Sequence, residues 1–277
     1  MLPWSRGLRK EFLPLFDAGD KGRPVLKPVA HLVLETLSEA GISDVTLVVQ
    51  PRDLAAVRNY FSIDPRFLAR HRGHPERLEE TRRLYERLLR LRVRFATQPR
   101  PIGFGDAVLR SESSVAGHSF LLHASDAVLD QPQRGRIPRA MVDLLRSADL
   151  DAVLLVRRVK DPRRYGVVEG TPEGRFRSWR SLRVTGIEEK PARPRSHWAA
   201  TALYAFSPAL YPALRRAAGR APSGAETELT WGIQELLSSG GSVEALVLEP
   251  PTAWMSVGSP ESYLRALRAS HRRGTGG

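Results

Sequence analysis

The chain has 277 residues, a formal charge of +13 and no cysteine. This length suits one large domain or two small ones, and the lack of cysteine excludes disulfides, thiolate catalysis and cysteine-ligated metals. The sequence contains no apolar run of the roughly 18 residues that a membrane span needs, and no signal-peptide core at its N-terminus. We therefore expect a cytoplasmic protein that does not bind membranes.

The positive charge comes almost entirely from arginine. Of the 43 basic residues 38 are arginine, and the five lysines are Lys10, Lys21, Lys27, Lys160 and Lys190. A basic chain attracts the phosphates of nucleotides or of nucleic acid. Here the charge is spread out and no aromatic residues are interleaved with it, which argues against nucleic acid and leaves a nucleic-acid-binding protein only as an alternative. Against this background, a lysine is more often needed as a compact point charge.

The first half of the chain alternates between helix and strand patterns. Helices are expected at 26–41, 53–61, 74–92, 105–115 and 138–149. Strands are expected at 44–50, 93–98, 119–126 and 151–159. The alternation predicts an α/β, Rossmann-like fold with a mostly parallel sheet flanked by helices.

After residue 160 short strand patterns at 166–170, 181–191 and 201–207 predict an antiparallel insertion. Helices return at 208–219, 226–240 and 259–272, and we expect a single domain over 1–271 with a frayed tail at 272–277. In such sheets ligands bind beyond the carboxyl ends of the strands. We therefore expect ligands to bind at three places: the loop after 93–98, the acid at 126 and the segment around 186–191.

Eight stretches, in this order, resemble the sugar-1-phosphate nucleotidyltransferases, and among them most closely the bacterial and archaeal UTP–glucose-1-phosphate uridylyltransferases. They are LPWSRGLRKEFLPLFD, RPVLKPVAHLVLETLSEAGI, QPRPIGFGDAVL, FLLHASDAVLD, RRYGVV, GIEEKP, GAETELTWGIQELL and WMSVGSPESYLRAL. The resemblance implies that UTP and glucose-1-phosphate give UDP-glucose and pyrophosphate with Mg²⁺ as cofactor. Thymidylyl or guanylyl transfer and a non-catalytic sugar-nucleotide-binding homologue are the alternatives, and a homo-oligomer stays open.

The resemblance also implies roles for individual residues. Lys10 corresponds to a catalytic, phosphate-binding lysine, and Asp126 to a nucleotide-binding aspartate that holds the metal. The remaining residues bind the base or the sugar phosphate: Gln98 and Gly103 for the base, Gly166, Glu189 and Lys190 for the sugar phosphate, with Glu226 in support. Each also has a plain structural reading, as a solvated lysine, a strand-to-helix turn, a capping aspartate or a surface ion pair.

The chain departs from the family pattern in several places. Family members have a first strand, inside the sheet, and a GxGTR loop ahead of the LP that here follows Met1. We therefore expect a gap in the sheet and a true start about 15–25 residues earlier. Ser256 replaces an aspartate that is the second Mg²⁺ ligand, which implies weaker metal binding and slow turnover. Smaller changes are Trp231, His197 and Arg9 in place of Asp, Asn and Pro.

Overall fold

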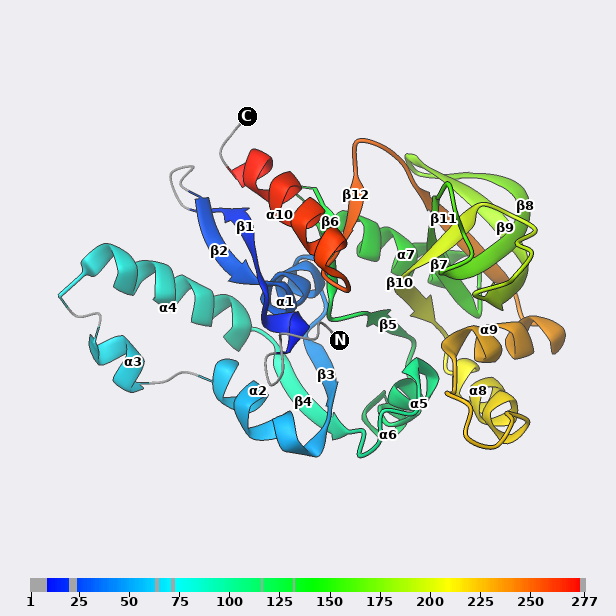
Figure 1. Cartoon of the computed structure of the whole chain (residues 1–277), viewed down its shortest axis with the longest axis horizontal. Coiled ribbons are helices and arrows are strands. Elements are labelled where there is room, and N and C mark those ends of the chain that lie inside the picture. The colour runs from blue at the N-terminus through cyan, green and yellow to red at the C-terminus, as the bar shows by residue number, and fades with distance from the viewer. Residues whose placement is uncertain are drawn as a thin grey trace.

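A computed structural model describes residues 9–19, 24–62, 65–70, 73–115, 117–131 and 133–274. In Figure 1 the N-terminal half of the chain lies on the left, and the strands β7 to β11 with helices α8 and α9 lie on the right. Helix α10, near the C-terminus, returns to pack on β1 of the N-terminal half. The predicted α/β class with an antiparallel insertion is confirmed.

The N-terminal half holds a hairpin and a two-stranded parallel sheet. The short 3-10 helix η1 (Lys10–Phe12) leads into β1 (Pro14–Ala18), which pairs with β2 (Pro24–Pro28). Helix α1 (Val29–Glu39) precedes β3 (Asp44–Val49), which runs parallel to β4 (Arg92–Thr97). Their connection contains η3 (Pro51–Asp53), α2 (Leu54–Tyr60), α3 (Pro65–Arg70) and α4 (Pro75–Leu89).

The expected helix at 26–41 begins later than predicted. Leu26 and Lys27 belong to β2, and the helix starts after Pro28, whose ψ of 146° is extended. The residue before a proline is biased away from helical backbone, so Pro28 delays the helix. Gly41 has φ of 88° and ends the helix as expected.

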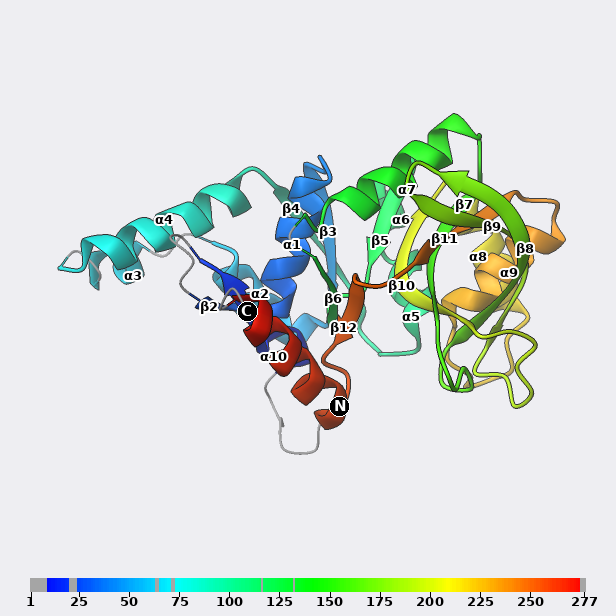
Figure 2. The same ribbon diagram turned by 90° about the horizontal axis from the view of Figure 1, so that it is seen from above.

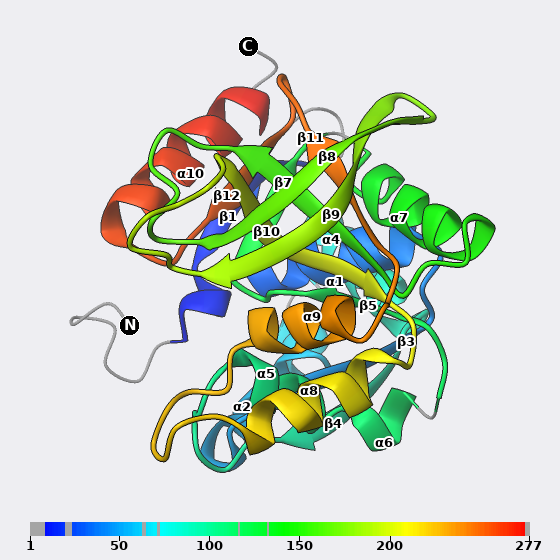
Figure 3. The ribbon, with the colours of Figure 1, turned by 90° about the vertical axis from the view of Figure 1, so that its right-hand side faces the viewer.

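Residues 120–248 contribute six strands to one mixed sheet. Its strand order is β5 (Phe120–His123), β10 (Trp198–Phe206), β7 (Ala152–Arg158), β11 (Val243–Leu248), β9 (Trp179–Glu189) and β8 (Gly166–Phe176). The β7–β11 pair is parallel and the other pairs are antiparallel. Figure 3 shows the long β8–β9 hairpin lying across β7 and β10.

Six helices and a strand pair complete the fold as the structure describes it. The helices are α5 (Phe104–Leu109), α6 (Glu112–Val115), α7 (Arg136–Ser147), α8 (Leu210–Gly219), α9 (Leu229–Ser238) and α10 (Pro260–Gly274). Strand β6 (Ala127–Asp130) pairs with β12 (Ala253–Ser256). The patterns did not predict β6, β11 or β12, and α10 runs beyond the expected start of the tail. None of the helices described has both the length and the apolar character needed to cross a membrane.

The core is densest around the six-stranded sheet. Leu154 of β7, Phe206 of β10 and Leu214 of α8 are completely buried there. By contrast, β3 pairs only with β4 and β5 pairs only with β10 among the described residues. Between β3 and β5 lies a cavity of about 900 Å³, the β3–β5 cavity. Figure 2 shows β3 and β5 as separate strands in this region. The gap that the resemblance implies inside the sheet lies here.

Candidate active site

Lys10 and Asp126 meet where strands end. Lys10 is the first residue of η1, and Asp126 follows β5. Lys10 Nζ and Asp126 Oδ2 lie 2.5 Å apart, and the two side chains are 39% and 21% exposed. This short, charge-assisted contact places an ammonium group and a carboxylate together at a point that solvent reaches. The structure thus brings together the lysine and the aspartate that the sequence singled out.

A second ion pair lies next to the first. Arg9 pairs with Asp53, which follows β3, as Lys10 pairs with Asp126, which follows β5. Two cations adjacent in sequence therefore bridge the carboxyl ends of β3 and β5. Arg9 stands out in the sequence only as a replacement for proline, and no sequence signal connects it to Asp53.

Ser256 lies beside Asp126. It stands opposite Ala127 in the β6–β12 register, and its Oγ accepts a hydrogen bond from the Gly258 amide at 3.2 Å. Ser256 Oγ and Asp126 Oδ2 lie 3.4 and 3.7 Å from the point that a Cβ would occupy on Gly258. A neutral hydroxyl therefore stands next to the predicted metal-binding aspartate.

Asp126 suits a Mg²⁺ ion as its single carboxylate ligand. Within the described ranges, no group of three or more His, Asp or Glu side chains could hold a metal by itself. Glu261 is engaged elsewhere, because its own backbone amide and Ser259 bond to its carboxylate and lower its pKa. Mg²⁺ accepts a single protein carboxylate when phosphate oxygens and water complete its coordination. The donor set therefore fits an ion that arrives with a polyphosphate.

The loop between β4 and α5 is fixed by its own hydrogen bonds. Gln98 Nε2 donates to the Gly103 carbonyl oxygen at 3.0 Å and to Asp106 Oδ2 at 2.9 Å. Gly103 has φ of 114°, and a Cβ there would lie 2.3 Å from the Thr227 carbonyl oxygen. Only glycine fits this backbone and this close approach. With both amide hydrogens engaged, Oε1 is the Gln98 atom that can accept a hydrogen bond from a ligand.

Gly166, Glu189 and Lys190 form one group where β8 begins and β9 ends. Gly166 stands opposite Glu189 in the β8–β9 register. Lys190 has φ of 44°, and its amide donates to the Tyr165 carbonyl oxygen at 3.0 Å. Its Nζ lies 3.1 Å from Glu189 Oε1, and the hydrogen bond to this carboxylate raises the lysine pKa. The ammonium stays charged, and its left-handed backbone is of the strained kind that clusters at functional sites.

Glu228 belongs to this group and was not predicted. Its Oε1 lies 3.7 Å from Lys190 Nζ, and burial, followed by the charge of Glu189, raises its carboxyl pKa. Nearby, Thr230 has a buried Oγ1 with no hydrogen-bond partner among the described residues, and its Cγ2 lies 2.9 Å from the point of a Gly166 Cβ. The predicted helix at 226–240 concealed Glu228, because that helix begins only at Leu229.

Glu226 lies at the margin of the same group. It is exposed, and its charge adds to the rise of the Lys190 and Glu228 pKa values. The supporting role of Glu226 therefore stays a prediction.

Residues 226–228 join the Gln98–Gly103 loop to the Lys190 group. The Thr227 amide donates to the Ile102 carbonyl oxygen at 2.7 Å, and the Gly105 amide donates to the Thr227 carbonyl oxygen at 2.8 Å. The next residue, Glu228, faces Lys190. One short segment therefore positions both the Gln98–Gly103 loop and a carboxylate of the other group.

Comparison with known proteins identifies the family. The family model described as nucleotidyl transferase matches residues 5–273, nearly the whole chain. The chain belongs to the nucleotidyltransferase family. Its relatives are sugar-1-phosphate nucleotidyltransferases, so the resemblance of the eight sequence stretches is confirmed.

Curated relatives in this family are named for different bases. Glucose-1-phosphate thymidylyltransferase of Neisseria gonorrhoeae is 25% identical over 276 residues, which cover 96% of this chain and 76% of the relative. The putative UTP–glucose-1-phosphate uridylyltransferase of Bacillus subtilis is 28% identical over 253 residues, which cover 86% of this chain and 81% of the relative.

Solved structures of UDP-glucose pyrophosphorylases share the fold. UTP-bound UGPase from Acinetobacter baumannii has a TM-score of 0.77 and 24% identity, covering 98% of this chain and 88% of that one. An apo UDP-glucose pyrophosphorylase has a TM-score of 0.82 and 18% identity, covering 99% and 94%. At these identities the likeness establishes the fold of this nucleotidyltransferase. Its substrates have to be inferred from the residues of the site.

Two of the described histidines have structural partners. His197 is exposed and its Nδ1 lies 3.0 Å from the Val159 carbonyl oxygen. His123 is stacked on Trp254, and burial lowers its pKa to about 4.

Proposed function

We propose that the chain transfers a uridylyl group from UTP to glucose-1-phosphate. An oxygen of the sugar phosphate attacks the α-phosphorus of UTP in line. A new P–O bond forms, the bond to the β-phosphate oxygen breaks, and pyrophosphate leaves with that electron pair. Such a reaction needs positioning and charge neutralisation more than covalent catalysis. The observation that carries the proposal is the Lys10–Asp126 pair together with the Lys190 group, both positioned where strands end.

The two lysines have separate tasks in this proposal. Lys10 contacts the triphosphate and stabilises the charge that develops as pyrophosphate departs. Lys190 contacts the phosphate of the sugar, while Glu189 accepts hydrogen bonds from sugar hydroxyls near Gly166. Mg²⁺, held by Asp126 and the triphosphate, would neutralise phosphate charge.

Base selection falls to the Gln98–Gly103 loop. The Gln98 Oε1 acceptor suits the N3–H of a pyrimidine, which uracil and thymine share. Gln98→Ala should weaken UTP and dTTP alike by roughly 1–3 kcal/mol, because it leaves a buried base edge unpaired. Equal affinity for ATP, GTP and UTP in calorimetry, unchanged by the substitution, would overturn the role of this loop.

The reaction is tested by pyrophosphate release from UTP and glucose-1-phosphate. Lys190→Arg should raise the KM for glucose-1-phosphate about tenfold, and Lys10→Arg should lower kcat by a similar factor or more, because a planar fork replaces a point charge. Lys160→Arg is the matched control, since Lys160 is an exposed lysine outside the site. Equal kinetics in all three variants would reduce Lys10 and Lys190 to surface charges.

Thymidylyl transfer is the second candidate, because several relatives carry that name. A dTTP-dependent rate above the UTP-dependent rate would favour it. Binding of UDP-glucose without turnover under all conditions would favour a non-catalytic homologue.

A further inference from the structure

Asp106 is a buried carboxylate in contact with Gln98. It lies in the first turn of α5 and is only 6% exposed. Its Oδ2 accepts a hydrogen bond from Gln98 Nε2 at 2.9 Å, and the Gly103 carbonyl oxygen accepts another from the same nitrogen at 3.0 Å. A buried carboxylate needs partners for its oxygens, and here one partner is the glutamine proposed above to face the base.

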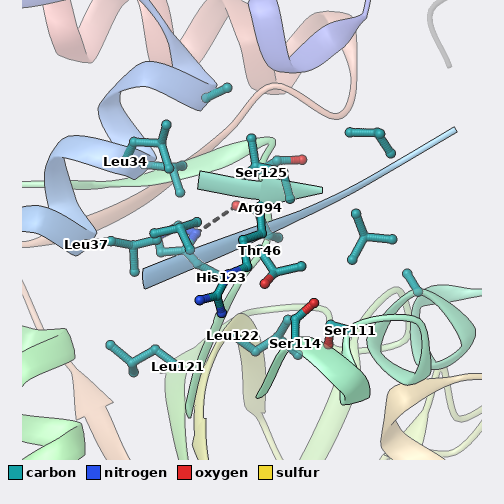
Figure 4. Close-up of a pocket in the computed structure, with 18 of the residues that line it drawn as sticks. Leu34, Leu37, Thr46, Arg94, Ser111, Ser114, Leu121, Leu122, His123 and Ser125 are labelled. Carbon is teal, nitrogen blue, oxygen red and sulfur yellow. Dashed lines mark hydrogen bonds between the residues drawn. The ribbon is translucent and has the colours of Figure 1, made fainter. Parts of the chain in front are cut away.

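Arg110 is the second partner of the Asp106 carboxylate. It follows Asp106 by one helical turn, and its Nη2 donates to Asp106 Oδ1 at 3.0 Å. Because Arg110 binds mainly to Oδ1, Oδ2 is left to Gln98. The turn after Arg110 is fixed in its place, since Ser111 Oγ donates to the Val108 carbonyl oxygen at 2.7 Å at the wall of the β3–β5 cavity (Figure 4).

These contacts fix the orientation of the Gln98 side-chain amide. An amide oxygen and an amide nitrogen have nearly the same shape, so the orientation of a glutamine follows from its partners. An ionised carboxylate and a carbonyl oxygen only accept hydrogen bonds, so Asp106 and Gly103 both require the Gln98 nitrogen. Turning the amide by half a rotation would bring Oε1 against two oxygens, one of them charged. The acceptor Oε1 is therefore the end of the amide that is left for a ligand.

Uracil and cytosine have the same outline but differ in the polarity of one edge. Uracil carries the donor N3–H where cytosine carries the acceptor N3, and the O4 acceptor of uracil is replaced by an amino group in cytosine. A fixed acceptor at Gln98 therefore matches uracil and thymine but faces the N3 lone pair of cytosine. A buried polar site rejects a base that leaves its atoms unpaired.

We propose that Asp106, held by Arg110, is a positioning residue that selects uracil and thymine over cytosine by fixing the orientation of the Gln98 amide. This inference rests on the proposed function, in which Gln98 faces the base. Asp106 acts through Gln98 and has no role in the transfer of the nucleotidyl group.

The test is Asp106→Asn, which keeps the shape of the side chain but leaves it a single oxygen. Arg110 attracts that oxygen, which turns the new amide nitrogen toward Gln98 and favours the reversed Gln98 amide. The ratio of UTP affinity to CTP affinity, measured by calorimetry on the full chain, should fall about tenfold. Glu112→Gln is the matched control, because Glu112 pairs with Arg215 in place of Gln98, and its ratio should equal that of the parent. Equal weakening of UTP and CTP by Asp106→Asn would show a structural role only and would overturn the proposal.

A second measurement uses the parent chain and covers the case in which the variant fails to fold. Gln98 Nε2 carries two hydrogens, and their exchange with water is followed separately by nuclear magnetic resonance, with the signals identified by their loss in Gln98→Ala. Both should exchange at least about tenfold more slowly than those of the exposed Gln133. Fast exchange of one of the two hydrogens would overturn the proposal, because only Gly103 or only Asp106 would then hold the amide.

The nucleotides separate this inference from the proposed function. Parent affinity for ATP as high as for UTP would overturn the proposed function, and this inference with it. Preference of the parent for UTP over ATP, with a ratio of UTP to CTP affinity that Asp106→Asn leaves unchanged, would overturn the role of Asp106 alone.

Discussion

Strands β3 and β7 have similar sequences but very different surroundings. DVTLVV of β3 and AVLLVRR of β7 are both apolar and rich in valine and leucine. Residues Ala152–Val156 of β7 are completely buried between β10 and β11, whereas residues 46–49 of β3 remain partly exposed beside a cavity. The difference teaches that the burial of a strand is set by its neighbours and not by its own composition.

The two halves of the candidate site share this contrast. The Glu189–Lys190 group lies at the end of β9, inside the complete six-stranded sheet. The Lys10–Asp126 pair lies at the mouth of the β3–β5 cavity. We therefore expect the Glu189–Lys190 group to be held more rigidly than the Lys10–Asp126 pair.

The largest effect should come from replacing one leucine with alanine in each of the two strands. Leu154→Ala should lower the free energy of unfolding by about 3–4 kcal/mol, because it opens a hole in a fully packed core. Leu47→Ala should cost only about 1 kcal/mol, because Leu47 already borders a cavity. Urea denaturation of both variants measures the contrast, and equal losses would show that β3 is as well packed as β7.

The second largest effect should come from acid, which we expect to destabilise the part of the molecule around the β3–β5 cavity. Burial lowers the pKa of His123 from 6.5 to about 4. Between these two values the imidazole takes up a proton in the unfolded chain but stays neutral in the folded chain, so the folded state loses stability as the pH falls. The free energy of unfolding should fall by up to about 3 kcal/mol between pH 7 and pH 4 on this account. His123→Phe should flatten the profile measured by thermal melts, while the same change at the exposed His118 should leave it as in the parent.

Metal binding should respond more modestly to Ser256→Asp. A second carboxylate beside Asp126 should tighten Mn²⁺ binding about tenfold, or roughly 1.4 kcal/mol, measured by electron paramagnetic resonance without nucleotide. Turnover at low Mg²⁺ should rise by a similar factor. Ser259→Asp, at the start of α10, is the control. No gain in either measurement would show that one carboxylate suffices here.

The smallest effect concerns Glu228. Burial raises its pKa, so it gains a proton more readily than an ordinary glutamate as pH falls, and its negative charge opposes an incoming phosphate. Glu228→Gln should lower the KM for the sugar phosphate about threefold at pH 8 and less at pH 5.5, where the parent side chain is more often neutral. Glu244→Gln is the matched control, because the Glu244 pKa is also raised by burial but the residue lies on β11 beside Arg183. A pH-independent change would assign Glu228 to structure.

Sequence patterns predicted the elements that carry a strong period. The buried strand at 44–50, the helix at 138–149 and the strand at 151–159 all appear within a few residues of their expected bounds. Strands β6 and β12 have four residues each, too few to show a period, and β11 follows the predicted helix at 226–240 in a stretch where the patterns predict no strand. The β1–β2 hairpin was hidden because its second strand merges with the apolar start of α1.

The candidate site divides in the same way. Motifs that follow one another in the order of the family predicted five of its residues: Lys10, Asp126, Gly166, Glu189 and Lys190. Arg9–Asp53 and Thr227–Gly103 join residues that are far apart in the chain, and such contacts depend on tertiary packing that no local pattern encodes. Glu228 was lost to a boundary error of three residues at the start of a helix.

The hydrogen bonds between Thr227 and residues 102–105 couple two parts of the candidate site. The backbone of Thr227 holds residues 102–105, and its neighbour Glu228 faces Lys190. We therefore expect a substitution that displaces the loop at 102–105 to displace the carboxylate beside Lys190 as well. With the roles proposed above, nucleotide preference and sugar preference are therefore coupled at this point of the fold, and we expect a change in one to alter the other.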